Sequence, residues 1–250
     1  MNLEADDVHL WMTRCSTSID PVLLREYRSL LSSSERERQQ SFGPEKNRRR
    51  DMLTRVLLRT TLSRYSDTNP RDWRFRLGLH GKPEISEPAS TLKFNLSHSE
   101  DYIVLAVTRQ YDVGVDIEYI RRKSDYAAIA DRYFSDPENV DLAASPIETR
   151  RGRFYDYWTL KEAHVKARGL GLAASLSSFS IALNQDNGAE ITFYGESGER
   201  SVNWQFWRFL PVTDYRMALA LRCGQDTVVK LSMFETIPLR TTSCFEALGM

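Results

Sequence analysis

The sequence predicts an α+β protein made of two similar halves. A long amphipathic helix is followed by several strand-like segments, and this cycle occurs twice along the 250 residues. Three short echoes also recur at offsets between 102 and 113 residues. They pair Asp7-Val8 with Asp112-Val113, residues 48–65 with residues 150–169, and Asp101-Tyr102 with Asp214-Tyr215. Because short strands look alike, the echoes alone do not establish a duplication.

The first half begins with a strand-like segment at residues 8–13 and helical periodicity at residues 21–31. Ser32 and its neighbours supply capping residues for a short helix that runs to Phe42, and Gly43-Pro44 ends it. Between about residues 45 and 65, apolar side chains at three- and four-residue spacing predict a long amphipathic helix. Strand-like segments follow near residues 73–77, 92–96, 102–108 and 113–118.

The second half repeats this order. Helices are predicted near residues 126–133 and 147–168, and strands near residues 179–183, 191–194, 202–209 and 216–221. We place the division near residues 111–113, which gives an N-terminal half of residues 1–112 and a C-terminal half of residues 113–250. From about residue 236 onward the sequence shows no periodicity, and we expect a loosely attached tail.

The composition is that of a soluble globular protein, with 41% hydrophobic and 27% charged residues. The net charge is zero, so nothing global indicates nucleic acid or an anionic membrane as a partner. The three cysteines form no CxxC pair, which argues against a disulfide framework and a zinc site. The acidic N-terminus has no signal-peptide core, and no stretch is long and apolar enough to span a membrane. We therefore expect a cytoplasmic protein.

Charge is nevertheless concentrated in one segment. Between Ser32 and Arg76, twelve Lys or Arg residues face six acids, a local excess of +6. A helical face this basic is most often simply solvated. Beside a phosphate site it becomes a plausible clamp, because arginine binds phosphate oxygens in a bidentate manner.

The string VGVDIE at residues 113–118 reads as a buried strand with two carboxylates, Asp116 and Glu118, on the same face. An acid inside such an apolar strand needs a partner or a metal ion. The alternative is that Ile117 packs inward, so that both acids face outward as ordinary surface residues.

The string WTLKEAHVK at residues 158–166 reads as a helix in which Trp158, Glu162 and Lys166 follow one another at four-residue steps. One stripe of this helix therefore carries an acid and a base. Glu162 and Lys166 could be an ordinary surface pair, worth a few tenths of a kcal/mol. If the two strings converge, three carboxylates and a lysine suit a magnesium ion and a phosphate-bearing ligand.

Two further motifs precede these strings: the turn Gly81-Lys82-Pro83, and the string FNLSHS at residues 94–99. Together the four motifs, in this order, resemble the Sfp-type 4'-phosphopantetheinyl transferases. They span residues 81–166 of the chain. The resemblance implies a pseudo-dimer of two α+β halves, with the active site in the cleft between them.

The resemblance also implies a reaction, the transfer of 4'-phosphopantetheine from coenzyme A to a serine of an acyl or peptidyl carrier protein. The other product is adenosine 3',5'-bisphosphate. Asp116, Glu118 and Glu162 would hold Mg²⁺, and Glu162 would also deprotonate the serine. Lys166 would contact the pyrophosphate and stabilise the leaving group. Lys161, about 100° around the helix from Glu162, would face the protein interior or the carrier.

The remaining family positions would bind coenzyme A. His98 is expected to contact its phosphates and is also a catalytic candidate. The other expected coenzyme A contacts, besides Asp116 and Lys166, are Arg38, Arg49, Arg50, Gly81, Lys82, Pro83, Asn95 and Ser97. Arg36 and Arg48 are close alternatives for the positions that contact the 3'-phosphate. Asp51 departs from the family pattern, and we expect it to turn away from the phosphate or to pair with an arginine.

Two other functions are compatible with the same residues. A magnesium-dependent hydrolase of a nucleotide pyrophosphate would use the same acids to activate water, and would release free phosphopantetheine. A non-catalytic module that binds coenzyme A or a carrier would need neither the metal acids nor Glu162. For the transferase we expect a monomer, because duplication within one chain supplies both halves. Its carrier would be a transient partner.

Overall fold

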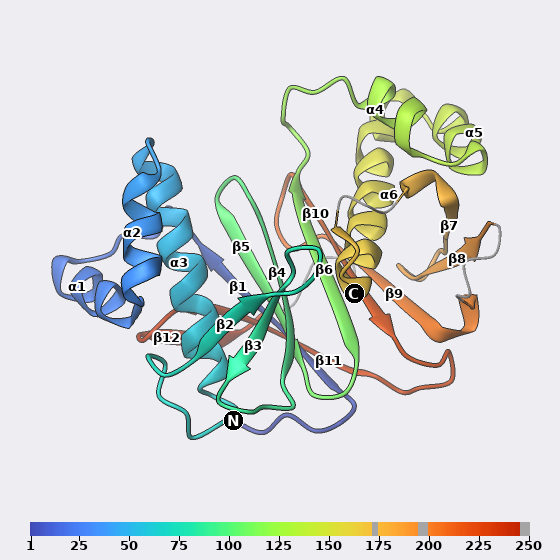
Figure 1. Cartoon of the computed structure of the whole chain (residues 1–250). Helices are drawn as coiled ribbons and strands as arrows, with labels where there is room; N and C mark the ends of the chain where they lie inside the picture. The colour runs from blue at the N-terminus through green and yellow to red at the C-terminus, as the bar shows by residue number, and fades with distance from the viewer. Residues whose placement is uncertain (172–174, 195–199, 246–250) are drawn as a thin grey trace. The chain divides into compact units, whose positions relative to one another are not determined.

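The computed structural model describes residues 1–171, 175–194 and 200–245 (Figure 1). The chain divides into two compact units, and each is described by itself. The first unit contains residues 1–76, 83–110 and 229–245. The second contains residues 77–82 and 111–228.

The first unit is built on a five-stranded sheet with the order β12-β11-β1-β5-β4. β1 pairs in parallel with β11 and antiparallel with β5, and the other neighbouring strands are antiparallel. The strands of this sheet are β1 (Asp7–Arg14), β4 (Lys93–Ser99), β5 (Tyr102–Thr108), β11 (Lys230–Ile237) and β12 (Thr241–Cys244). The unit also contains α1 (Pro21–Leu30), α2 (Ser33–Ser41), α3 (Glu45–Leu62) and the hairpin strands β2 (Arg74–Leu77) and β3 (Pro83–Glu87).

Local sequence signals account for the helix ends of this unit. Asp20 accepts hydrogen bonds from two backbone N–H groups at the start of α1, and a proline follows it. Ser32 and Glu35 form the capping box that begins α2. α1 and α3 bury their apolar faces against one face of the sheet, where the fully buried Trp11, Tyr27 and Trp73 belong to a single core; α2 has no buried residue.

The second unit combines a three-stranded antiparallel sheet, with the order β6-β10-β9, and a separate two-stranded pair, β7-β8. Its strands are β6 (Asp112–Tyr119), β7 (Phe179–Leu183), β8 (Ala189–Phe193), β9 (Trp204–Phe209) and β10 (Tyr215–Arg222). Its helices are α4 (Tyr126–Tyr133), α5 (Asp136–Ala144) and the long α6 (Ile147–Arg168), which lies along β6 and β10 (Figure 1).

The two units share one order of elements. Each begins with a strand, continues with three α-helices of which the third is the longest, and then has a two-stranded hairpin and two further strands. In both units the opening strand pairs antiparallel with the last of these strands, which pairs antiparallel with the one before it. Asp7 and Asp112 begin the opening strands, while Tyr102 and Tyr215 begin the last ones. The α+β prediction is confirmed, and the sequence echoes lie at equivalent places.

The C-terminal region differs from the sequence prediction. Residues 229–245 belong to the first unit rather than to the C-terminal half. β11 was not predicted, and it pairs with β1. The expected loose tail from residue 236 instead includes β12, which pairs with β11; residues 246–250 lie outside the described chain. Helix α5 and strand β3 were also not predicted.

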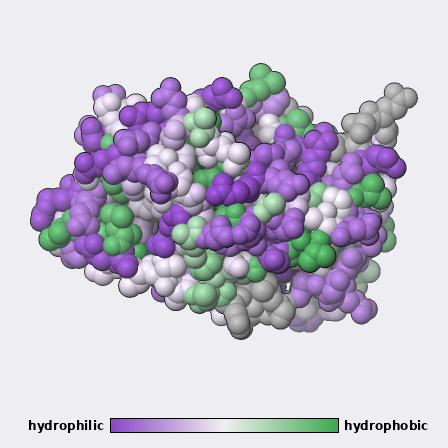
Figure 2. Space-filling model, turned by 90° about the horizontal axis from the view of Figure 1, so that it is seen from below, coloured by the Kyte–Doolittle hydropathy of each residue, from purple (hydrophilic) through white to green (hydrophobic). Residues whose placement is uncertain are grey.

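Hydrophilic side chains dominate the face shown in Figure 2, and the apolar residues on it form small, separate groups. Among the described helices, none combines the length and the apolar character that a membrane crossing requires.

A buried polar cluster in the first unit links β1 to the chain just after α3. The indole N–H of Trp11 donates to the hydroxyl of Tyr65 at 2.8 Å, and Tyr65 Oη lies 2.7 Å from Nδ1 of His9. Since the hydroxyl accepts from Trp11, its own proton is available for a neutral His9. Burial lowers the pKa of His9 from its ordinary value of 6.5, and the charge of Asp7 opposes this shift only in part.

We predict that the free energy of unfolding falls as the pH decreases below about 6.5, partly because of His9. Below this pH, His9 takes up a proton in the unfolded chain but stays neutral in the folded chain. The contribution of His9 to the free energy of unfolding is therefore complete above pH 6.5 and is lost as the pH falls below it. One such group adds at most about 1.4 kcal/mol per pH unit. In urea unfolding at pH 7.5 and 5.5, His9→Gln should show a smaller pH effect than wild type. The exposed His80→Gln should match wild type; equal pH effects in all three proteins would contradict this prediction.

Candidate active site

The central feature of the second unit is a close backbone contact between β6 and α6. A Cβ atom added to Gly114 would lie 1.9 Å from the carbonyl oxygen of Ala163 and 2.5 Å from the amide nitrogen of Ala167. Both obstacles are backbone atoms, so no side-chain movement could relieve them. The glycine in VGVDIE is therefore required by the approach of the helix.

The neighbouring strand also presents small residues to the helix. Ala220 and Ala218 of β10 are the cross-strand partners of Gly114 and Asp116, and both alanines are buried. Cross-strand partners lie on the same face of a sheet. Because the side chains on this face are small, α6 can lie close to the sheet. The alternation of side chains along the strand places Asp116 and Glu118 on the same face as Gly114.

Asp116 is almost completely buried, at 3% exposure, and so is Ile117 on the opposite face. β6 is therefore covered on both sides, and the surface-acid interpretation is wrong for Asp116. Its Oδ1 lies 2.5 Å from Nζ of Lys166, which also lies 3.4 Å from the carbonyl oxygen of Val115. Glu118, nearer the end of the strand, is half-buried and lies 3.8 Å from a guanidinium nitrogen of Arg122.

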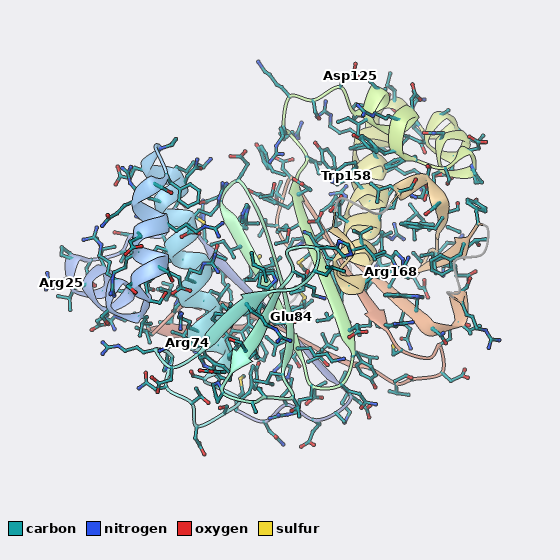
Figure 3. The ribbon with its side chains drawn as sticks, viewed as in Figure 1. Arg25, Arg74, Glu84, Asp125, Trp158 and Arg168 are labelled. Carbon is teal, nitrogen blue, oxygen red and sulfur yellow. The ribbon has the colours of Figure 1, made fainter. Side chains whose placement is uncertain are left out.

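Glu162 precedes Lys166 by one turn of α6, between the labelled Trp158 and Arg168 in Figure 3. It is half-buried, and burial raises the pKa of its carboxyl. The charge of Asp116 raises this pKa further, whereas the charge of Lys166 lowers it. These mutual effects show that the two acids and the lysine belong to one electrostatic cluster. A carboxylate with a raised pKa is a stronger proton acceptor.

Lys161 faces the interior, one of the two orientations expected from the sequence. Its ammonium is fully buried, lies 2.8 Å from Oε2 of Glu138 and donates to the carbonyl oxygens of Leu176 and Phe179. Burial lowers the pKa of Lys161 to about 8, although Glu138 opposes the shift. Glu138 also accepts from the backbone N–H groups of Ser135 and Ile181. Sequence reasoning missed Glu138, whose only local signal is the capping box that starts at Ser135.

His164 lies two positions after Glu162 and is fully buried. Its ring is surrounded by aromatic rings, with centroid distances of 4.3 Å to Trp204 and 4.8 Å to Phe179. Neither of its ring nitrogens has a hydrogen-bond partner among the residues that the structure describes. Burial lowers its pKa to about 3, so the imidazole is neutral at physiological pH and acts as an aromatic packing group.

The Gly-Lys-Pro turn is attached to the same strand and helix. Gly81 has a φ of 83°, a left-handed conformation that favours glycine. Nζ of Lys82 donates to the carbonyl oxygens of Val113 at 3.0 Å and Ala167 at 3.2 Å. An ammonium at the last turn of α6 also suits the negative end of the helix. Lys82 thus links the turn to β6 and α6, and Pro83 is the first residue of β3. Their nucleotide contacts stay predictions.

The predicted residues of the FNLSHS string lie in the first unit, on strand β4. The strand predicted near residues 92–96 continues to Ser99 and so includes His98. Because side chains alternate along a strand, Asn95 and Ser97 share one face and His98 lies on the other. His98 shares its face with Phe94, which packs in the core with α3. Asn95 and Ser97 are buried, whereas His98 is exposed.

The arginines of the first unit have different surroundings. The Arg49 guanidinium donates to the backbone carbonyls of Cys15, at 2.6 Å, and Thr17. Arg50 donates to Oδ1 of Asn47 at 3.3 Å. Arg38 is exposed on α2.

Asp51 pairs with an arginine, as expected, because its Oδ1 lies 3.9 Å from Nε of Arg55. Burial raises the pKa of Asp51, whereas the charges of Arg55 and, more weakly, Arg38 lower it. Arg38 is thus on the side of α2 that faces Asp51 and Arg55 of α3.

Among the described residues, no group of three or more His, Cys, Asp or Glu side chains is arranged to hold a metal ion. The donor chemistry around Asp116 nevertheless fits a hard cation. Asp116, Glu118 and Glu162 offer only carboxylate oxygens, and the repulsion that Asp116 exerts on Glu162 is what a divalent cation would relieve.

Comparisons with known proteins match the chain to one family. Residues 112–220 match the model of the 4'-phosphopantetheinyl transferase superfamily, and residues 22–110 match a model described as 4'-phosphopantetheinyl transferase, N-terminal. The chain is 35% identical over 193 residues to 4'-phosphopantetheinyl transferase HetI of Nostoc sp., covering 76% of this chain and 80% of that protein. It is 34% identical over 165 residues to 4'-phosphopantetheinyl transferase Sfp of Bacillus subtilis, covering 66% of this chain and 72% of that protein. It is also 38% identical over 143 residues to 4'-phosphopantetheinyl transferase psf-1 of Bacillus pumilus, covering 57% and 60%.

We predict that Gly114→Ala separates α6 from β6 and thereby moves Glu162 and Lys166 away from Asp116. Overpacking of this kind costs about 1–3 kcal/mol or more. The urea midpoint should fall, and activity should fall further than the loss of folded protein explains. Gly43→Ala is the matched control, because its added Cβ would meet nothing within 4 Å. If Gly114→Ala and Gly43→Ala behaved alike, the backbone contact would not determine the site.

Proposed function

The chain belongs to the 4'-phosphopantetheinyl transferase superfamily, and from this premise we propose how its own residues transfer 4'-phosphopantetheine from coenzyme A to a serine of a carrier protein. The observation that carries the proposal is the cluster of Asp116, Glu162 and Lys166 on β6 and α6. Lys166 Nζ lies 2.5 Å from Asp116 Oδ1, and the carboxylate of Glu162 precedes this ammonium by one turn of α6. Both are needed when a hydroxyl attacks a phosphoanhydride.

The transfer is a displacement at the phosphorus atom that carries the pantetheine arm. The serine oxygen forms a new P–O bond, and the bond from this phosphorus to the bridging oxygen of the pyrophosphate breaks. Glu162 accepts the serine proton. The ammonium of Lys166 contacts a pyrophosphate oxygen and neutralises the charge that develops on the leaving adenosine 3',5'-bisphosphate.

Asp116, Glu118 and Glu162 would hold a Mg²⁺ ion, the cation that best suits carboxylate and pyrophosphate oxygens. Such an ion supplies charge neutralisation of the pyrophosphate. The Lys166 contact gives the buried Asp116 an ion-pair partner and holds it in place on the strand.

Residues of the first unit are proposed to bind the nucleotide portion of coenzyme A. Arg38 and Arg50 are the candidates for the 3'-phosphate, since the charge of Arg38 lowers the pKa of Asp51, which follows Arg50 in α3. His98 lies on the face of the sheet that packs against α3, the helix of Arg50, which favours His98 over Ser97 as a phosphate contact. We propose that the enzyme acts as a monomer with a transiently bound acyl or peptidyl carrier.

We predict that Glu162→Gln abolishes transfer and leaves the fold and the coenzyme A affinity nearly unchanged. Loss of the general base alone should reduce the rate ~10²–10⁴-fold. Transfer is measured as the mass gain of an apo carrier, and coenzyme A binding by calorimetry. Glu148→Gln, an exposed glutamate on the same helix, should retain full activity. Activity of Glu162→Gln within a few-fold of wild type would remove this residue from the mechanism.

Asp116→Asn should raise the magnesium concentration needed for half-maximal activity and also lower the maximal rate. The carboxamide keeps an oxygen but loses the charge that attracts both the cation and Lys166. A magnesium titration of activity tests this, with the exposed Asp131→Asn as the control. A titration that superimposes on wild type would make Asp116 purely a structural partner of Lys166.

Arg38→Ala and Arg50→Ala should weaken coenzyme A binding far more than dephospho-coenzyme A binding. The proposed partner is the 3'-phosphate, and hydrogen bonds to charged groups contribute about 1.5–3 kcal/mol. Calorimetry with both ligands provides the comparison, and Arg25→Ala on α1 is the control. Equal losses for the two ligands would show that these arginines do not contact the 3'-phosphate.

A further inference from the structure

Helices α1, α2 and α3 of the first unit border a cavity of about 550 Å³ that is open to solvent. Four arginines line it: Arg28 from α1, Arg36 from α2, and Arg48 and Arg49 from α3. Two glutamines, one glutamate and two apolar side chains complete the lining. The volume is in the range of small-molecule sites in proteins.

These arginines have no carboxylate partner among the described residues. Arg36 donates to the carbonyl oxygen of Leu31 at 2.7 Å, and Arg48 donates to the carbonyl oxygens of Phe42 and Gly43 at 2.9 and 2.7 Å. Arg49 likewise donates to backbone carbonyls. Carbonyl groups satisfy N–H donors but do not cancel a positive charge.

Other arginines of the same unit do have acidic partners. Arg59 lies 2.8 Å from Glu35, and Arg14 lies 2.7 Å from Asp101. At the cavity, four positive charges stand against the single carboxylate of Glu45. The cavity therefore carries an excess of positive charge, and its potential attracts anions.

Arg38 and Arg50, the arginines proposed for the 3'-phosphate of coenzyme A, do not line the cavity. On α3 the lining residues are Glu45, Arg48, Arg49 and Met52, a single stripe at helical spacing. Arg50 lies outside this stripe. On α2, Arg38 is two positions after Arg36, about 200° around the helix, and its charge acts on Asp51 of α3.

We propose that this cavity is a second anion site, which binds a small molecule carrying two or more phosphate groups. Guanidinium groups bind phosphate oxygens in a bidentate manner, and several converging on one cavity favour a polyphosphate over a single carboxylate. Leu24 and Met52 give the cavity an apolar part that can receive an uncharged portion of the ligand. The inference goes beyond the transfer reaction and does not depend on it.

The test uses inorganic pyrophosphate as the probe and the full chain, with calorimetry in the presence and absence of saturating coenzyme A. Pyrophosphate should bind under both conditions with the same dissociation constant within a few-fold. Arg28→Gln should raise that constant about tenfold or more, the loss of one charge-assisted contact. Arg25→Gln is the matched control, because Arg25 lies on the same helix (labelled in Figure 3) but does not line the cavity.

Three results would overturn the proposal. Wild type could fail to bind pyrophosphate, or coenzyme A could displace it completely, in which case the protein has one phosphate site only. Equal weakening by Arg28→Gln and Arg25→Gln would show general electrostatic attraction. Circular dichroism checks the fold of each variant. Arg36→Gln, from a different helix, provides a second variant that should weaken pyrophosphate binding to a similar extent.

Discussion

The backbone contact between Gly114 and the Ala163–Ala167 turn of α6 is the constraint on which the rest of the site depends. The helix lies so close to the strand that no side chain fits at residue 114, where an added Cβ would lie 1.9 and 2.5 Å from backbone atoms of α6. The carboxylates of β6 and the acid and base of α6 therefore meet at short range. The 2.5 Å pair of Asp116 and Lys166 and the raised pKa of Glu162 are consequences of this approach.

The opposite side of α6 is held by buried polar and aromatic contacts. Lys161 is held by Glu138 and two carbonyl oxygens, so any rotation of the helix would leave an unpaired charge in the interior. Removing one partner of a buried pair costs about 3–5 kcal/mol. His164 fills an aromatic cage and stays neutral. On one side of α6, Lys161 and His164 fix the helix in the core, and on the other side the helix carries Glu162 and Lys166. The precise placement of the site therefore depends on the packing of the second unit's core.

Much of the second unit could be predicted from local sequence, because β6 and α6 have strong periodicity and Gly, Asp and Glu occur at informative positions. The α+β class was confirmed, and one of the two interpretations left open for Asp116 was excluded. Features that depend on contacts between residues far apart in the sequence could not be predicted from it. The partner of Lys161 comes from another helix, Lys82 bonds carbonyls far along the chain, and β11 exists because β1 offers it a free edge. That Ser97 and His98 lie on opposite faces could be inferred only from the structure, which shows that β4 extends to Ser99.

The central claim is that the residues of β6 and α6 transfer the phosphopantetheine group to a protein hydroxyl rather than to water. Intact-mass spectrometry of a small panel of apo carrier proteins, incubated with the enzyme, coenzyme A and magnesium, tests it most directly. The account predicts that at least one carrier gains the mass of a single phosphopantetheine group, with an equal amount of adenosine 3',5'-bisphosphate released. Free phosphopantetheine accumulating while every carrier keeps its original mass would contradict the account, and would assign the same residues to hydrolysis.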